Sequence, residues 1–264
     1  MRAKLCKISV LVLICFVLHK ITISCEEKNK RLDFIRGEQV EVSTEISEDE
    51  TFKQLVSPYK LDLDNKINEV LCYNPRMLDK REAELESSIG NLLADACFVA
   101  GDSILRSVKG RGIDFAVFNY GGIRAAIQKG NVTIEDVYQV MPFENRLVVV
   151  ELNPDQVRSL IDYLIRQHKA HPISGIKLKL SENNKSEVFI GNKKWDPNKK
   201  YHVLTIDYLQ HGGGNMTFLK EPDYLYVSDL KVRDVLIRNF RSLDTLRARL
   251  DGRFTDLRNK YTEE

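Results

Sequence analysis

The sequence has few of the residues that build disulfide scaffolds, zinc sites or nucleic-acid interfaces. It holds five cysteines and one tryptophan in 264 residues, and no two cysteines have the C-x-x-C spacing of a metal or redox site. The formal net charge is +2, yet four cations lie in the first 24 residues, which contain no acid, so the remaining chain carries −2. A near-neutral chain gives no electrostatic reason to expect nucleic acid as a partner. The sequence also contains no P-loop and no Ser-His-Asp arrangement.

Residues 1–24 have the pattern of an export signal. A positively charged start precedes an apolar run at residues 8–18. That run is shorter than the roughly 20 residues that a comfortable membrane span needs. We therefore expect the protein to be exported.

Cys25 is the candidate lipid attachment site. Ser24 directly precedes it, which resembles a bacterial lipoprotein cleavage site, although Thr22 stands where such sites usually have leucine. A plain secretory signal and an uncleaved anchor are the alternatives. Residues 25–49 are polar and predict a tether, so we expect a lipoprotein of the periplasm, the outer membrane or the cell surface. The lipid would be the chain's link to the membrane.

Two further cysteines, Cys72 and Cys97, lie in the chain after Cys25. Both stand in apolar segments with helical spacing. They could form a disulfide, or they could be two buried thiols, and the sequence leaves both alternatives open.

Helical and strand patterns are mixed along residues 50–257, without strict βαβ repetition. With 43% hydrophobic and 30% charged residues, the composition is that of an ordinary globular protein. The predicted helices are residues 50–73, 88–108, 133–141, 230–243 and a segment that begins after Asn153. The predicted strands are residues 114–119, 146–152, 176–180, 188–190, 201–207 and 224–227. This mixture predicts a single mixed α/β domain over residues 50–257, with more than one sheet, followed by a tail at residues 258–264.

A glycine turn follows the predicted strand 114–119. Gly121 and Gly122 allow the backbone to turn sharply and to approach a ligand closely. The Asn119 amide can donate and accept hydrogen bonds, and the forked Arg124 guanidinium suits a carboxylate or a phosphate. A strand-end turn with a surface arginine is the alternative interpretation.

Residues 212–214 are three consecutive glycines. Such a run loses much conformational entropy on folding, so a close backbone contact with a ligand is one interpretation. A flexible surface loop is the alternative, and this segment taken alone favours it.

Four motifs in this chain together resemble one known family. They are residues 86–95 (ESSIGNLLAD), 119–124 (NYGGIR), 141–145 (MPFEN) and 211–215 (HGGGN). In this order they are similar to successive motifs of the C-terminal domain of 5'-nucleotidases and UDP-sugar hydrolases. The resemblance covers roughly residues 55–257. In that family, this domain binds the nucleoside part of the substrate, and a separate N-terminal domain holds two metals and a catalytic Asp-His pair.

The resemblance implies roles for particular residues. Asn119 and Arg124, at the turn made by Gly121 and Gly122, would bind ribose and phosphate oxygens. Phe143 would stack on the base, unless it is a core side chain, which aromatic residues often are. The other side of the base would be closed by the glycine loop from Gly212 to Asn215, which includes Gly213 and Gly214.

The chain departs from the family pattern at several positions. Leu85 stands where the family usually has an arginine, and Met216 stands where it has the second aromatic of the base clamp. Phe218 is the nearest aromatic, and a phenylalanine at position 216 would be expected to restore the clamp. The acidic ribose contact could be Glu221 or Asp223.

The metal-binding motifs of the family's N-terminal half do not occur in this sequence. Of the histidines after residue 25, we interpret His168 and His171 as residues of a helix end stabilised by the helix dipole, and His202 as structural. His211 flanks the glycine loop and could approach a ligand. We therefore expect this chain to hold no metal or cofactor of its own. It would bind a nucleotide or nucleoside as half of a 5'-nucleotidase, with the metals supplied by a separate metallophosphoesterase chain. A non-catalytic binding module and a remnant with a decayed site are the alternatives.

Overall fold

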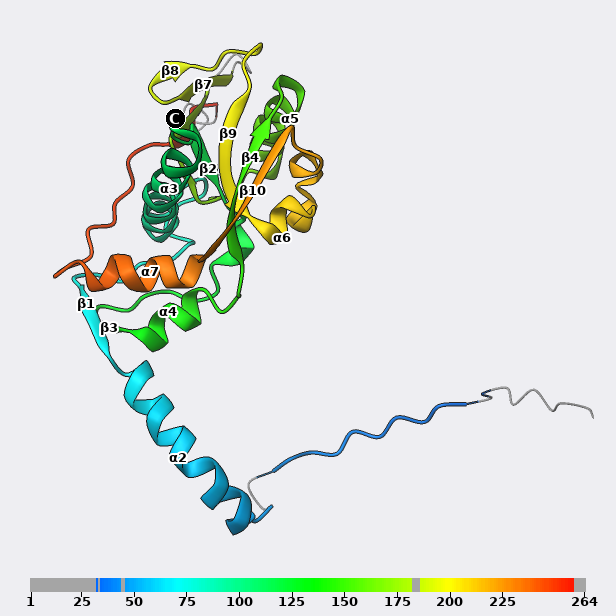
Figure 1. Cartoon of the computed structure of the whole chain (residues 1–264), viewed down its shortest axis with the longest axis vertical. Helices are drawn as coiled ribbons and strands as arrows, with labels where there is room; N and C mark the ends of the chain where they lie inside the picture. Colours follow the sequence, from blue (N-terminus) through cyan, green and yellow to red (C-terminus); the bar gives the residue numbers. More distant parts are fainter. Residues whose placement is uncertain (1–31, 33, 44–45, 182–185, 259–264) are drawn as a thin grey trace, which may run out of the picture. The chain divides into compact units, whose positions relative to one another are not determined.

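The computed structural model describes residues 32, 34–43, 46–181 and 186–258 (Figure 1). The predicted signal segment and Cys25 lie outside the described residues. The chain divides into two compact units, residues 1–53 and residues 54–264. In the first unit, the described residues of the predicted tether form no helix or strand.

The second unit mixes helices and strands in the way the sequence predicts. Its α-helices are α2 (Glu50–Ile67), α3 (Ser88–Lys109), α4 (Ile134–Val140), α5 (Pro154–Gln167), α6 (Asp207–Gln210) and α7 (Val232–Arg241). The first four residues of α2 belong to the first unit. Short 3-10 turns are η1 (Tyr120–Gly122), η2 (Gly213–Asn215) and η3 (Thr217–Leu219). The strands are β1 (Val70–Asn74), β2 (Phe115–Val117), β3 (Gly130–Thr133), β4 (Arg146–Leu152), β5 (Ile173–Ser174), β6 (Ile176–Leu180), β7 (Ser186–Ile190), β8 (Lys193–Lys194), β9 (Tyr201–Ile206), β10 (Tyr224–Lys231) and β11 (Phe254–Asp256).

Capping residues fix where three of the helices begin. Thr133 and Asp136 form the predicted capping box of α4, and Asn153 caps α5 ahead of Pro154. The cap of α3 is Ser87, one residue before the predicted Ser88, and its hydroxyl accepts a hydrogen bond from the Gly90 amide at 3.2 Å.

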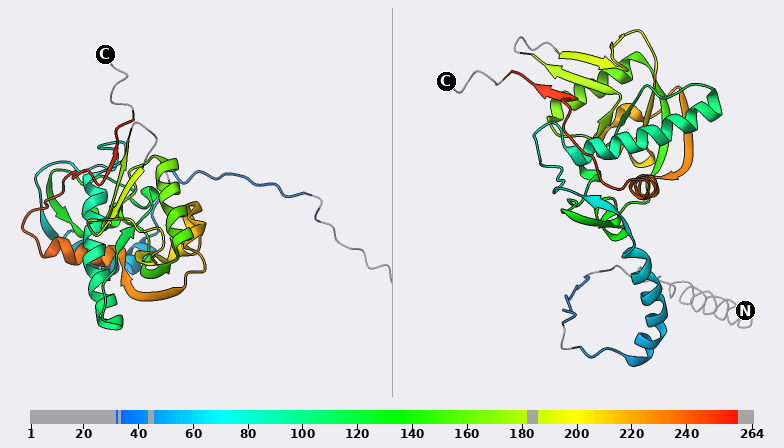
Figure 2. Two further views of the ribbon diagram at one scale, coloured as in Figure 1. Left: turned by 90° about the horizontal axis from the view of Figure 1, so that it is seen from above. Right: turned by 90° about the vertical axis from the view of Figure 1, so that its left-hand side faces the viewer.

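Within the described residues, the strands form three sheets, so the prediction of more than one sheet is confirmed. The largest has the order β10-β4-β9-β2-β5, the second has the order β11-β6-β7-β8, and β1 pairs with β3. Every residue of β9 is buried, which requires cover on both faces of its sheet. Figures 1 and 2 show that α3 lies across one face, and Figure 1 shows α5 on the other side.

The prediction of one helix over residues 50–73 is wrong at its C-terminal end. The helix ends at Ile67, and residues 70–74 form β1, which runs antiparallel to β3. This pairing buries Leu71 and Cys72 in the core. A strand partner more than 50 residues away in the sequence therefore overrides the local helical spacing.

Neither Cys72 nor Cys97 forms a disulfide within the described residues, and both are buried. Burial raises the pKa of the Cys72 thiol to about 11 and also raises the pKa of Cys97. The alternative of two buried thiols is thus the one that the structure shows.

Strand directions bring three distant segments to one end of the main sheet. β2 is parallel to β9, and β4 is antiparallel to β9. The chain therefore leaves β2 and β9 at the same end at which it enters β4. The glycine turn, the glycine loop and the segment around Phe143 are the connections at that end.

Candidate functional site

The glycine turn and the glycine loop lie against each other at this end of the sheet. Asn119 follows β2, and Gly214 follows β9 and α6. A Cβ atom built on Gly214 would lie only 3.8 Å from the Cβ of Asn119. Two motifs that are about 90 residues apart in the sequence therefore form one surface.

Asn119 has its side-chain amide available at this surface. The residue is half-buried, and within the described residues its amide group makes no hydrogen bond. Gly122 folds back onto it, because its backbone N–H donates to the Asn119 carbonyl at 3.0 Å. A Cβ on Gly122 would lie 3.2 Å from the Asn119 side-chain oxygen, so a larger residue there would crowd the amide.

Arg124 and Phe143 stand next to each other on the same side of the molecule. The Arg124 guanidinium carbon lies 5.8 Å from the centroid of the Phe143 ring. Phe143 is 40% exposed, so it is not a core side chain. Within the described residues, the Arg124 guanidinium makes no salt bridge with a carboxylate. An uncommitted cation beside an exposed aromatic ring suits a ligand that carries both a ring and an anion.

A second cation, Lys80, adjoins this pair and was not predicted from the sequence. Its ammonium group donates to the Ile123 carbonyl at 2.6 Å and lies 4.6 Å from the Tyr120 ring centroid. Partial burial lowers the pKa of Lys80, and the nearby Arg124 charge lowers it further. Lys80 lies in an irregular segment before the first motif, where no periodic pattern could identify it.

Two tyrosines hold the glycine loop. The Tyr163 hydroxyl donates to the Gly214 carbonyl at 2.8 Å, and the Gly214 N–H donates to the Tyr208 hydroxyl at 3.3 Å. Gly212 and Gly214 adopt φ values of +91° and +62°, which glycine tolerates best. A Cβ on Gly213 would lie 2.5 Å from the Tyr208 ring. The loop is therefore packed and hydrogen-bonded, unlike a free surface loop.

Two predicted contacts pack against other parts of the protein. Met216 is 0% exposed, because its side chain points into the core, so it does not offer a face to a base. Phe218 is half-buried and packs edge-on against Tyr163, at 5.4 Å between ring centroids. Met216, which stands where the family has the second aromatic of the base clamp, is therefore not placed to contact a base.

Asp223 lies at the opposite end of the main sheet, where its carboxylate pairs with Lys200 at 2.6 Å. Lys200 directly precedes β9, whereas the glycine loop follows the end of β9. Six residues of strand separate these positions by roughly 20 Å. The Glu221 carbonyl lies 3.5 Å from the Gln156 side-chain amide, at the start of α5. Asp223 is therefore not placed to contact a ribose bound beside Asn119.

Residues of the first motif, 86–95, make contacts that stabilise the fold. The Glu86 carboxylate accepts hydrogen bonds from the Asn91 side chain and from the backbone amides of Asp251 and Gly252, all within 2.9 Å. Leu85, which stands in place of the family's arginine, is buried in the core. These residues thus fasten the C-terminal segment to α3.

The histidines have varied surroundings. Burial lowers the pKa of His171 to about 4, and its Nδ1 lies 3.2 Å from both the Tyr120 backbone N–H and the Phe118 carbonyl oxygen. His168 ends α5 and, contrary to a purely dipolar role, pairs with Asp256 at 2.9 Å and Glu84 at 3.1 Å. His202 is buried and lies 3.3 Å from Glu151. His211 is exposed and contacts the Asp207 carbonyl.

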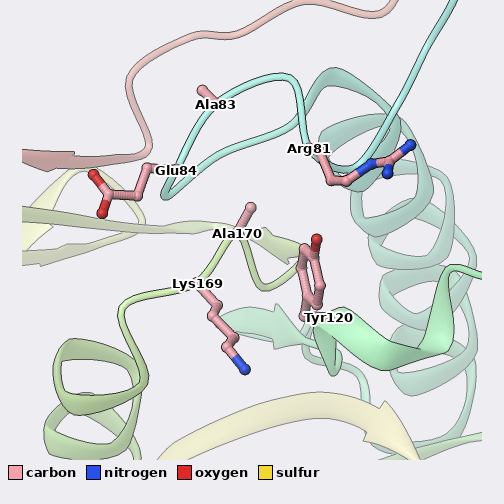
Figure 3. Close-up of a pocket in the computed structure, with 6 residues that line it drawn as sticks. All are labelled: Arg81, Ala83, Glu84, Tyr120, Lys169 and Ala170. Carbon is pink, nitrogen blue, oxygen red and sulfur yellow. The ribbon is translucent and has the colours of Figure 1, made fainter.

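A cavity of about 310 Å³ adjoins the site at Tyr120, which is one of its lining residues. Figure 3 shows the segment with Arg81, Ala83 and Glu84 on one side, and Tyr120 with Lys169 and Ala170 on the other. The Asp79 carboxylate accepts hydrogen bonds from Nε and Nη2 of Arg81, along one edge of the guanidinium, which offsets its charge. In the described part of the chain, no three His, Cys, Asp or Glu side chains come together as a metal-binding group.

The profile of the family described as "5'-nucleotidase, C-terminal domain" matches residues 67–221. The trifunctional nucleotide phosphoesterase protein YfkN of Bacillus subtilis is 28% identical over 190 residues, which are 65% of this chain and 13% of YfkN. Protein UshA of Escherichia coli is 27% identical over 225 residues, which are 79% of this chain and 38% of UshA.

Solved structures have the same fold. The 5'-nucleotidase precursor from Thermus thermophilus superimposes with a TM-score of 0.65 at 24% identity, covering 80% of this chain and 44% of that one. The NAD nucleotidase of Haemophilus influenzae gives a TM-score of 0.60 at 18% identity, covering 79% and 42%. The chain thus spans less than half the length of each of these relatives. Because the profile matches more than half of its residues, and the fold agrees, the chain belongs to the 5'-nucleotidase C-terminal domain family.

Proposed function

We propose that this domain binds a nucleotide or nucleoside at the surface formed by Asn119, Arg124, Phe143 and the glycine loop. The observation that carries the proposal is the meeting of Asn119 and Gly214 at one end of the main sheet. Asn119 supplies an amide, and the adjacent Arg124 and Phe143 supply a guanidinium and an exposed ring, which are groups that suit ribose, phosphate and base.

Each group has a distinct role in the proposal. The Asn119 amide hydrogen-bonds the ribose hydroxyls, and Arg124 pairs with phosphate oxygens. The Phe143 ring stacks on the base. Lys80 adds positive charge close to Arg124, which favours an anionic ligand over a neutral one. Gly214 keeps the surface beside Asn119 free of a side chain, so that a ligand can approach closely.

We further propose that the chain acts as the binding half of a 5'-nucleotidase. A separate metallophosphoesterase chain would hold the metals and supply the attacking water. The names of the relatives support a phosphoesterase context, and those relatives contain additional sequence beyond the part matched here. The signal-like residues 1–24 support export, with Cys25 as the proposed lipid anchor.

Calorimetry tests ligand binding by the chain, and activity assays test its role as half of a 5'-nucleotidase. Adenosine, AMP and UDP-glucose are titrated into the chain, which should bind at least one of them. Hydrolysis of AMP and UDP-glucose is then measured with the chain alone, with the metallophosphoesterase domain of a relative alone, and with both. We expect activity only with the phosphoesterase domain present, and a lower KM when the chain is added.

If the chain alone hydrolyses AMP or UDP-glucose in the presence of a chelator, the proposed separation of binding and catalysis between two chains is wrong. Binding without any effect on a phosphoesterase would instead favour a non-catalytic binding module. A complete lack of binding would indicate a fold whose site has decayed. Mass spectrometry of the mature N-terminus decides whether Cys25 carries a lipid.

A further inference from the structure

Tyr163 lies between the two glycine segments that form the proposed site. It belongs to α5, is 5% exposed, and had no role in the sequence prediction. Its hydroxyl donates to the Gly214 carbonyl at 2.8 Å. Its ring packs edge-on against His171, at 5.5 Å between centroids, and against Phe218, at 5.4 Å. Tyr163 therefore contacts the glycine loop at Gly214, and it also contacts His171, which lies against the glycine turn.

His171 extends this connection to the glycine turn. Its Nδ1 lies 3.2 Å from both the Tyr120 backbone N–H and the Phe118 carbonyl oxygen, and these two residues flank Asn119. Gly214, Tyr163, His171 and Tyr120 thus form a continuous series of contacts. The series links the loop after β9 to the turn after β2 through a buried part of α5.

The glycine loop depends on such external contacts. Residues 212–214 have no side chains with which to anchor themselves, and glycine has the largest backbone freedom of any residue. Tyr163 holds the carbonyl of Gly214, whereas Tyr208 holds its N–H and is 51% exposed. Of these two bonds, the one from the buried Tyr163 is better shielded from competing water.

We propose that Tyr163 is a positioning residue of the nucleoside site. It holds Gly214 close to Asn119 before the ligand arrives, so that the loop does not have to be ordered on binding. The role rests on the proposed function, because it presupposes that a nucleoside occupies the surface beside Asn119. Tyr163 itself is buried and touches no ligand.

The test compares Tyr163→Phe with Tyr201→Phe. Both substitutions remove one hydroxyl and keep a buried ring. The Tyr201 hydroxyl accepts a hydrogen bond from the Asp196 amide at 3.0 Å, near the start of β9 and far from the glycine loop. Three quantities are measured on the full chain: adenosine affinity by calorimetry, the melting temperature, and amide hydrogen exchange at Gly213, Gly214 and Asn215.

We expect Tyr163→Phe to weaken adenosine binding about tenfold, the size expected for one lost hydrogen bond. It should also speed amide exchange in the loop. Tyr201→Phe should lower the melting temperature by a similar amount and leave both other quantities unchanged. Equal affinity and equal loop exchange in the two variants would overturn the positioning role.

The proposed function and the positioning role can fail separately. If the unmodified chain binds no adenosine, AMP or UDP-glucose, the proposed function fails. Amide hydrogen exchange in the glycine loop then decides by itself whether Tyr163 anchors the loop. Faster exchange confined to Tyr163→Phe supports Tyr163 as the anchor of the loop, and unchanged exchange rejects it.

Discussion

The carboxylate of Glu86 accepts a hydrogen bond at 2.6 Å from the backbone amide of Asp251, which lies 165 residues later in the chain. The same carboxylate binds the next amide and the side chain of Asn91. A buried acceptor with three donors explains why the C-terminal segment stays on α3.

Glu86→Gln should destabilise the domain by about 1–3 kcal/mol, because a glutamine NH2 group would face backbone N–H donors and leave them unsatisfied. Urea denaturation measures the loss. Hydrogen exchange at Asp251 and Gly252 should rise, whereas ligand affinity should not change. A variant as stable as the parent chain would show that these bonds do not hold the segment.

Phe143→Ala should lower nucleotide affinity by about 1–3 kcal/mol, the usual scale of base–aromatic stacking. With 40% of the residue exposed, the loss of stability should stay well below the roughly 3–5 kcal/mol of a core phenylalanine. Leu225→Ala, at a residue that is 41% exposed on β10, is the matched control. Stacking is rejected if the two variants bind AMP equally well.

Arg124→Ala should weaken AMP binding by roughly 1.5–3 kcal/mol and leave adenosine binding nearly unchanged, since a charged hydrogen bond to phosphate is lost. Arg158→Ala removes an exposed arginine that instead stacks on Trp195 and serves as the control. Calorimetry with both ligands gives the comparison. Equal losses for AMP and adenosine would show that Arg124 does not read the phosphate.

Met216→Phe should destabilise the chain and not improve its affinity. Met216 is 0% exposed, so a rigid ring there has to displace core atoms, at a cost of about 1–3 kcal/mol. This outcome replaces the expectation, drawn from the sequence, that an aromatic at this position completes a base clamp. Thermal melting and AMP titration of the Met216→Phe variant decide between a core position and a base clamp. Tighter AMP binding at unchanged stability would support the base clamp.

His171 should make stability depend on pH between about 6.5 and 4. The unfolded imidazole titrates near pH 6.5 and the buried one near 4, so the unfolded chain takes up the proton first as the pH falls. The stabilisation is complete above pH 6.5 and declines by about 3 kcal/mol as the pH approaches 4. Urea unfolding at several pH values should therefore diverge from that of His171→Asn, whose amide oxygen can replace Nδ1. Parallel curves would contradict this assignment.

Local signals predicted much of the fold, and non-local contacts account for the errors. The box of Thr133 and Asp136 and the cap at Asn153 are local chemistry, and both were predicted correctly. The strand Val70–Asn74 was missed because it depends on pairing with β3. The same holds for the site. Asn119 and the glycine loop stand out by residue type, whereas Tyr163 and Lys80 acquire their roles only through the folded arrangement.

The position of Glu86 has a consequence for how relatives of this chain should be read. Glu86 and Asn91 both hydrogen-bond the C-terminal segment, and these contacts do not depend on a bound nucleotide. A descendant that lost its ligand would therefore be expected to keep these two residues and to tolerate change at Arg124 and Phe143, which the fold does not require. The first motif therefore indicates membership of the family, whereas Arg124 and Phe143 indicate whether the binding site is retained.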